Sequence, residues 1–89
     1  MSRYRVQILP AALKTLETYT EKLQRRIIRK IDALSENPRP NGCKKLIVSQ
    51  DVYRLRSGEY RIIFKIQDEV LLVLVLKVGH RKDVYRKDF

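Results

Sequence analysis

Residues 70–85 read VLLVLVLKVGHRKDVY, and this segment carries the strongest evidence for a sheet. Its first part, residues 70–78, is almost entirely apolar, which is typical of a strand that lies in the centre of a sheet and is buried on both faces. Because a strand end is held rigidly, we expect the residues that follow to be aimed at one sheet edge. They include the only histidine of the chain, two cations and a tyrosine: His80, Arg81, Lys82 and Tyr85. The combination indicates a site that handles phosphate.

The length and composition predict one small domain that covers residues 1–89. A chain of 89 residues can bury one hydrophobic core but not two. Apolar residues make up 44% of the chain, which argues against disorder despite 34% charged residues. The longest apolar run is about half of the ~20 residues that a membrane helix needs, and the first residues lack the apolar core of a signal peptide. We therefore expect a cytoplasmic protein with no membrane partner.

The formal net charge is +10, and the basic residues run through the whole chain. A folded domain this basic is expected to meet a polyanion, which can be nucleic acid, an acidic membrane or an acidic protein. The alternative is a solvated surface that is rich in lysine. A polyanion partner is the interpretation that the charge favours.

The N-terminal half predicts a short strand and two helices. Residues 4–8 alternate with a period of two, and Pro10 suits the first turn of a helix. Thr18 or Thr20 can cap a second helix, which the Asn37-Pro38 pair ends. The apolar stripe of that helix consists of Leu23, Ile27, Ile31 and Leu34, and its opposite face of Lys22, Arg25, Arg26, Arg29 and Lys30.

The C-terminal half predicts three strands. One lies within residues 44–56 and is broken near residues 49–51, one spans residues 60–66, and the last spans residues 70–78. Residues 57–59 and 67–69 read as the turns between them. The element order is therefore βααβββ, an α+β domain in which two amphipathic helices cover one face of a mainly antiparallel sheet.

Alternation in the hairpin predicts a cluster of cations. If the helices cover the face that carries Tyr53, Leu55, Tyr60, Ile62 and Phe64, the opposite face of the two strands carries Arg54, Arg56, Arg61 and Lys65. An ordinary exposed sheet face would mix charges of both signs, whereas no acid interrupts this set inside either strand. Because clustered cations repel one another, we expect an anion to occupy the face.

The chemistry available to these residues is cleavage of RNA without a metal or other cofactor. One histidine, one cysteine and scattered acids cannot assemble a usual zinc or two-metal centre. The 2′-hydroxyl of RNA can itself attack the adjacent phosphate, and fixed arginines can stabilise the transition state. His80, with an ordinary pKa of ~6.5, is the candidate for proton transfer. Tyr85 is the candidate to stack on a base or to bond a phosphate.

At three places the chain resembles a known family. The residues are Tyr53-Arg54-Leu55-Arg56, Gly58-Glu59-Tyr60-Arg61-Ile62-Ile63-Phe64 and Val78-Gly79-His80-Arg81-Lys82-Asp83-Val84-Tyr85. Together with Pro10-Ala11-Ala12-Leu13-Lys14 and Lys44-Lys45-Leu46, they resemble the RelE/ParE toxin superfamily over nearly the whole chain. The resemblance implies a compact βααβββ fold and the toxin role in a type II toxin–antitoxin pair.

The resemblance also implies site roles. The RelE branch cleaves messenger RNA in the ribosomal A site, and the ParE branch inhibits DNA gyrase without cleavage. Because Arg61, Arg81 and Tyr85 match the RelE pattern, we expect an endoribonuclease: Arg61 would stabilise the transition-state phosphate, Arg81 would contact the phosphate and leaving group, and Tyr85 would orient the nucleotide. Arg54 and Arg56 stand where RelE enzymes often have lysines, so His80 would replace a lysine base or act as the acid. The other cations expected on RNA are Lys44, Lys45, Lys65 and Lys82.

Partners follow from the same resemblance. We expect an acidic or amphipathic antitoxin that wraps the basic face or displaces residues 82–89, in a complex that is oligomeric. Messenger RNA on the ribosome, with contacts to ribosomal RNA, is the expected target. The alternatives are a gyrase inhibitor of the ParE type and a plain RNA-binding module that leaves RNA intact.

Overall fold

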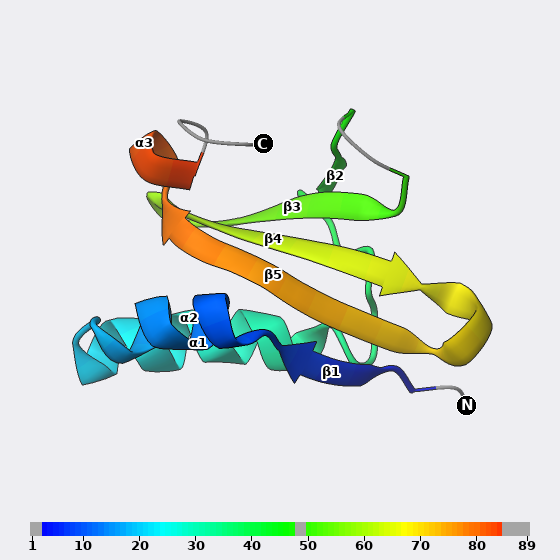
Figure 1. Ribbon diagram of the computed structural model, residues 1–89, viewed down its shortest axis with the longest axis horizontal. Coiled ribbons are helices and arrows are strands. Elements are labelled where there is room, and N and C mark those ends of the chain that lie inside the picture. Colours follow the sequence, from blue (N-terminus) through cyan, green and yellow to red (C-terminus); the bar gives the residue numbers. More distant parts are fainter. Residues whose placement is uncertain (1–2, 48–49, 85–89) are drawn as a thin grey trace.

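The computed structural model describes residues 3–47 and 50–84, which form an α+β fold with two helices on one face of a five-stranded sheet (Figure 1). The strand order is β1-β5-β4-β3-β2; β1 is parallel to β5, and the other neighbours are antiparallel. The elements are β1 (Arg5–Ile8), α1 (Pro10–Glu17), α2 (Glu21–Ala33), β2 (Lys44–Lys45), β3 (Val52–Ser57), β4 (Tyr60–Gln67), the 3-10 turn η1 (Asp68–Val70), β5 (Leu72–His80) and α3 (Arg81–Val84). The predicted fold class is confirmed.

Three local predictions are corrected by the structure. The strand expected within residues 44–56 is two strands, because β2 pairs with β3 across an intervening loop. The last strand begins at Leu72 rather than at residue 70, since η1 precedes it and Leu71 has a left-handed φ of 51°. It also continues to His80 rather than ending at residue 78, and α3 begins directly after it at Arg81.

The two long helices begin where the chain supplies suitable N-terminal groups. Pro10 occupies the first turn of α1, where its missing N–H leaves no helical bond unmade. Thr20, and not Thr18, caps α2, because its hydroxyl accepts a hydrogen bond from the N–H of Leu23 at 3.3 Å. Thr18 instead ends α1 and donates its hydroxyl to the carbonyl of Thr15. The cap fixes where the basic face of α2 begins.

The main core lies between the helices and the sheet. The residues buried there are Ala12, Leu16, Ile27, Ile31, Leu34, Leu55, Ile62, Phe64, Ile66, Val73, Val75 and Val78. A second, smaller cluster of Val52 and Ile63 lies apart from it, with Leu46 and Leu76 packed against that pair. The sheet face that α1 and α2 do not cover, called the open face below, is therefore apolar in part and cationic in part.

A β-bulge in β5 determines which way its second half faces. The register with β4 passes from the pair Phe64–Val75 to the pair Ile63–Lys77, so Leu76 has no direct partner there. One extra residue reverses the alternation beyond the bulge. The residues that then face the helices are Val78 and His80, and those on the open face are Lys77 and Gly79.

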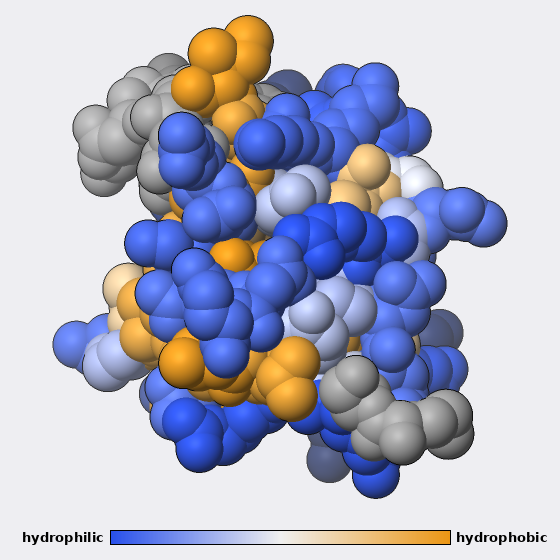
Figure 2. Space-filling model, turned by 90° about the vertical axis from the view of Figure 1, so that its right-hand side faces the viewer, coloured by the Kyte–Doolittle hydropathy of each residue, from blue (hydrophilic) through white to orange (hydrophobic). Residues whose placement is uncertain are grey.

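The end of the molecule that bears η1 exposes some apolar side chains in a mostly hydrophilic surface (Figure 2). Val70 is 63% exposed and Leu71 is 38% exposed. None of the helices in the described part of the chain is long and apolar enough to cross a membrane.

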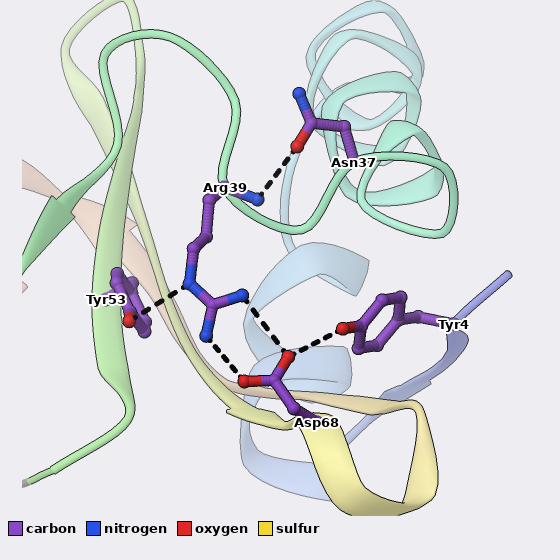
Figure 3. A network of polar contacts seen from close by, with 5 residues as sticks. All are labelled: Tyr4, Asn37, Arg39, Tyr53 and Asp68. Carbon is purple, nitrogen blue, oxygen red and sulfur yellow. Dashed lines mark hydrogen bonds and ion pairs between the residues drawn. The ribbon is translucent and has the colours of Figure 1, made fainter. Parts of the chain in front are cut away.

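A polar network joins the loop after α2 to η1, to β3 and to the residue that precedes β1 (Figure 3). Arg39 forms a forked ion pair with Asp68, in which Nη2 lies 2.8 Å from Oδ2 and Nη1 lies 3.2 Å from Oδ1. Arg39 Nε donates to the hydroxyl of Tyr53 at 3.2 Å, and the hydroxyl of Tyr4 donates to Asp68 Oδ1 at 2.6 Å. The network therefore joins β1, β3 and η1 through one loop residue.

The network changes the proton affinity of its members in opposite directions. Hydrogen bonds from Arg39, and then from Tyr4, hold the pKa of Asp68 below its ordinary value. The same carboxylate raises the pKa of Tyr4, because the bond needs the phenol to keep its proton. A lowered carboxyl pKa stabilises the fold above the ordinary value of ~3.9, and this contribution is lost as the pH falls through the folded value.

Asp68→Asn should therefore flatten the acid limb of stability. We expect the urea midpoint of the wild type to fall more steeply than that of the variant between about pH 5 and pH 3. The wild type loses the contribution of its ionised carboxylate as the pH falls, and the variant has no such contribution to lose. Asp32→Asn, an identical change at an exposed position of α2, is the control. Parallel acid limbs for the wild type and Asp68→Asn would refute the assignment.

Candidate phosphate-binding site

The carbonyls of the β3–β4 turn (residues 56–60) receive cations from the helix layer. Lys30 of α2 donates to the carbonyl of Arg56 at 3.2 Å, and Arg26 donates to the carbonyl of Ser57 at 3.5 Å. Gly58 closes the hairpin with a left-handed φ of +61°, which glycine adopts without strain. Sequence analysis placed Lys30 and Arg26 on a basic helix face but did not connect them with the hairpin, because only the packing of α2 on β3 brings them there.

Arg61, which lies in β4, forms hydrogen bonds with the same turn. It pairs with Arg56 across β3 and β4, so both start from the open face as predicted. Although it lies on the open face, Arg61 is only 7% exposed, and its Nη1 donates to the carbonyls of Gly58 at 3.1 Å and Tyr60 at 3.2 Å. Nε is buried without an acceptor among the described residues.

The charge of Arg61 is incompletely balanced. Among the residues whose side chains the structure describes, Arg61 forms no ion pair, and its guanidinium bonds two backbone carbonyls. A buried charge is costly unless it is paired, and arginine cannot shed its proton to escape that cost. The arrangement is therefore one in which a bound anion would be stabilised.

Arg81 reaches the turn from the end of β5. Its main-chain N–H donates to the carbonyl of Glu59 at 2.8 Å, and its Nε lies 2.9 Å from Glu59 Oε1. Both side chains remain more than half exposed. The turn therefore holds Arg61 of β4 and Arg81 of α3, two of the predicted phosphate ligands. Glu59 is a site neighbour that sequence reasoning missed, since an acid in a hairpin turn reads as a turn residue.

The remaining cations of the hairpin line an open hollow of about 530 Å³ beside β3. Arg54 is half-buried and Arg56 is exposed. Arg54 pairs with Lys44 of β2 on one side and Ile63 on the other. The lining residues are Lys30, Asn41, Gly42, Lys44, Arg54, Leu55, Arg56 and Gly58. The sequence predicted a cluster of cations from the strands alone, and the structure adds Lys30 of α2 to it.

A second hollow of about 410 Å³ continues the basic surface along α2. Its residues are Thr20, Lys22, Leu23, Arg25, Arg26 and Arg29. Arg26 belongs to this hollow and also bonds the β3–β4 turn, so the cations of α2 and of the hairpin meet at the turn.

His80 lies at the same end of the sheet but on the other face. It pairs with Tyr60, whose ring it meets edge-on at 5.5 Å, whereas Arg61 pairs with Gly79. Its Nδ1 accepts a hydrogen bond from the N–H of Lys82 at 3.3 Å. In the neutral ring the proton then resides on Nε2, which can donate a hydrogen bond but cannot take up a proton.

The other predicted residues are spread more widely. Lys65 is half-buried on the open face beside Leu74, far along β4 from the turn. Lys45 pairs with Tyr53 and so faces away from Arg54. Lys82 is exposed on α3, and Tyr85 lies outside the described residues. In the part of the chain that the structure describes, no group of three or more His, Cys, Asp or Glu residues could hold a metal ion.

Comparisons with known proteins agree with this geometry. Residues 6–85 match a family model described as the ParE toxin of the type II toxin–antitoxin system parDE. A RelE-like toxin protein of Escherichia coli is 31% identical over 87 residues, which cover 93% of this chain and 90% of that protein.

Among solved structures, the fold resembles that of the RelE–RelB complex of Pyrococcus horikoshii OT3, with a TM-score of 0.81 and 29% identity over 91% of this chain and 98% of that chain. It also resembles the toxin–antitoxin complex RelBE2 of Mycobacterium tuberculosis, with a TM-score of 0.79 and 27% identity over 93% of this chain and 97% of that chain.

Gly58→Ala tests how the turn is held. The left-handed conformation should cost about 1–2 kcal/mol with a β-carbon present. The new carbon would also lie 2.9 Å from Arg26 Nη2, so this flexible side chain should swing away. We expect urea denaturation to show that loss, and Gly58→Asn to show a smaller one because asparagine tolerates the conformation better. Gly42→Ala, where φ is +89° and nothing lies near the added carbon, is the control for backbone strain alone. Equal stability of Gly58→Ala and the wild type would contradict the turn geometry.

Proposed function

The chain belongs to the family of ParE toxins of type II toxin–antitoxin systems, within the RelE/ParE superfamily, and on that premise we propose that this toxin is a ribosome-dependent endoribonuclease that cleaves messenger RNA. In the proposed reaction the 2′-hydroxyl passes its proton to solvent water, and its oxygen bonds to the adjacent phosphorus. The bond from phosphorus to the 5′-oxygen breaks, and that oxygen gains a proton from solvent water. The products are a 2′,3′-cyclic phosphate and a 5′-hydroxyl.

The observation that carries the proposal is the placement of Arg61 and Arg81 against one turn. Arg61 is buried without an acid partner among the described residues, and Arg81 approaches the same turn from β5. Donors that are fixed before the reaction stabilise charge as it develops on a phosphate, without the cost of reorganisation. Arginine suits this role because it is permanently charged and presents a planar fork of donors.

The surrounding residues fit a polyanionic substrate. Arg54, Arg56 and Lys44 line the hollow beside β3, and we propose that they hold the phosphates that flank the cleaved one. The proposed role of Tyr85, to orient the nucleotide, rests on the family resemblance alone. For His80, the occupied Nδ1 leaves Nε2–H as a hydrogen-bond donor, and we propose that it bonds the leaving 5′-oxygen.

We also propose an antitoxin partner of acidic character. The solved relatives include toxins in complex with RelB antitoxins, and a net charge of +10 requires a complementary surface on any protein that covers it. Such a complex would form in the cytoplasm, before the toxin meets the ribosome.

The alternative is non-enzymatic inhibition of DNA gyrase, which the ParE description of the matching family model favours. In that case the cations would bind an acidic protein surface. A gyrase supercoiling assay with the purified toxin separates the two: inhibition of supercoiling with intact messenger RNA would replace our proposal with this one.

Arg81→Ala should lower the rate of messenger RNA cleavage on programmed ribosomes by at least about 100-fold, as removal of one preorganised donor does elsewhere. The fold should survive, because Arg81 is more than half exposed. Arg3→Ala removes the same charge from an exposed residue that pairs with Glu36, and it should cleave at nearly the wild-type rate. Equal losses in both variants would indicate general attraction to RNA, and full activity of Arg81→Ala would exclude Arg81 from the site.

A further inference from the structure

Glu59 is the acid that contacts the proposed phosphate ligands. Within the described residues the ion pairs of the chain join Arg3 to Glu36, Arg25 to Glu21, Arg39 to Asp68 and Arg81 to Glu59. Only the last of these lies at the β3–β4 turn. A carboxylate at this place repels the phosphates of RNA, so its presence beside Arg81 calls for a role that outweighs the repulsion.

The contact leaves part of Arg81 available. The ion pair joins Glu59 Oε1 to Nε of Arg81, so the two terminal nitrogens, Nη1 and Nη2, lie outside this contact. A guanidinium bound at Nε cannot rotate freely, yet it still presents its outer pair of nitrogens. That outer edge matches two oxygens of one phosphate.

The same turn also fixes Arg61. Arg61 bonds the carbonyls of Gly58 and Tyr60, the residues on either side of Glu59, while the carbonyl of Glu59 accepts the main-chain N–H of Arg81. The position of one guanidinium is thereby related to that of the other through a stretch of three residues. Free arginine side chains lose rotamer entropy when they bind, and this arrangement removes part of that loss before the substrate arrives.

We propose that Glu59 is a positioning residue, which orients the guanidinium of Arg81 relative to Arg61 so that both meet the same RNA phosphate. The inference rests on the proposed function. It requires that Glu59 act on the chemical step through Arg81 and not on the affinity for RNA, because its own charge opposes RNA binding.

The kinetic test compares Glu59→Ala and Glu59→Gln with the wild type on programmed ribosomes, in single-turnover reactions. Glu59→Ala should slow cleavage by roughly 10- to 100-fold, the scale expected when a reacting group is misplaced by about 1 Å. Glu59→Gln retains an acceptor for Nε and should recover much of the rate. Glu69→Gln makes the same change of charge at the other end of β4 and should cleave as the wild type does.

Affinity is measured separately, with messenger RNA that carries a 2′-deoxy nucleotide at the cleavage position. Glu59→Ala should bind this RNA as tightly as the wild type or more tightly. Tighter binding together with faster cleavage would show that Glu59 competes with phosphate for Arg81, which would overturn the proposal. Unchanged cleavage in Glu59→Ala would overturn it as well.

A readout that needs no activity is the Nε–H signal of Arg81 in the free toxin, assigned by its loss in Arg81→Lys. Exchange of this proton with water should be slow in the wild type and in Glu69→Gln, and fast in Glu59→Ala. Slow exchange in Glu59→Ala would refute the contact. A wild-type toxin that shows the contact but cleaves no RNA would refute the proposed function, and with it any role of Glu59 in cleavage. An active wild type together with a fully active Glu59→Ala variant would refute the role of Glu59 alone.

Discussion

The site depends on hydrogen bonds to the backbone carbonyls of the β3–β4 turn. The side chains of Lys30 and Arg26 approach from α2 and that of Arg61 from β4, whereas Arg81 donates its main-chain N–H to the carbonyl of Glu59 and pairs its guanidinium with the Glu59 carboxylate. Carbonyl dipoles can orient a guanidinium without cancelling its charge, which a full set of carboxylates would do. The turn therefore concentrates positive charge in fixed directions, and an anion can complete the balance.

The sheet and the helices hold that turn and its cations in position. The core between α2 and the strands brings Lys30 and Arg26 to the hairpin, although they are distant from it in sequence. The bulge near Leu76 places Gly79 opposite Arg61, so the strand neighbour of Arg61 in β5 carries no side chain. At the opposite end, the Arg39–Asp68 pair ties the loop that leads to β2, which forms one wall of the hollow.

Much of this could be predicted from the sequence, for identifiable reasons. The stripe from Leu23 to Leu34 has helical spacing, the hairpin alternates strictly, and Arg54, Arg56 and Arg61 start from one face as expected. The position of His80 could not be predicted, because a bulge reverses the alternation and no residue of the apolar run marks where it occurs. The burial of Arg61 was missed for a related reason: alternation tells which face a side chain leaves, but not that it folds back onto carbonyls. Glu59 and Lys30 depend on contacts between distant elements, which a local pattern does not contain.

In the proposed mechanism, preorganised cations stabilise the transition state of a cleavage in which RNA supplies its own nucleophile. The most direct measurement is the chemical nature of the new ends, by mass spectrometry of messenger RNA cleaved on programmed ribosomes. We predict a 2′,3′-cyclic phosphate on the upstream fragment and a 5′-hydroxyl on the downstream fragment. We also predict no cleavage when the nucleotide at the cleavage position lacks its 2′-hydroxyl. A 3′-hydroxyl with a 5′-phosphate, or full cleavage of the 2′-deoxy substrate, would contradict the mechanism.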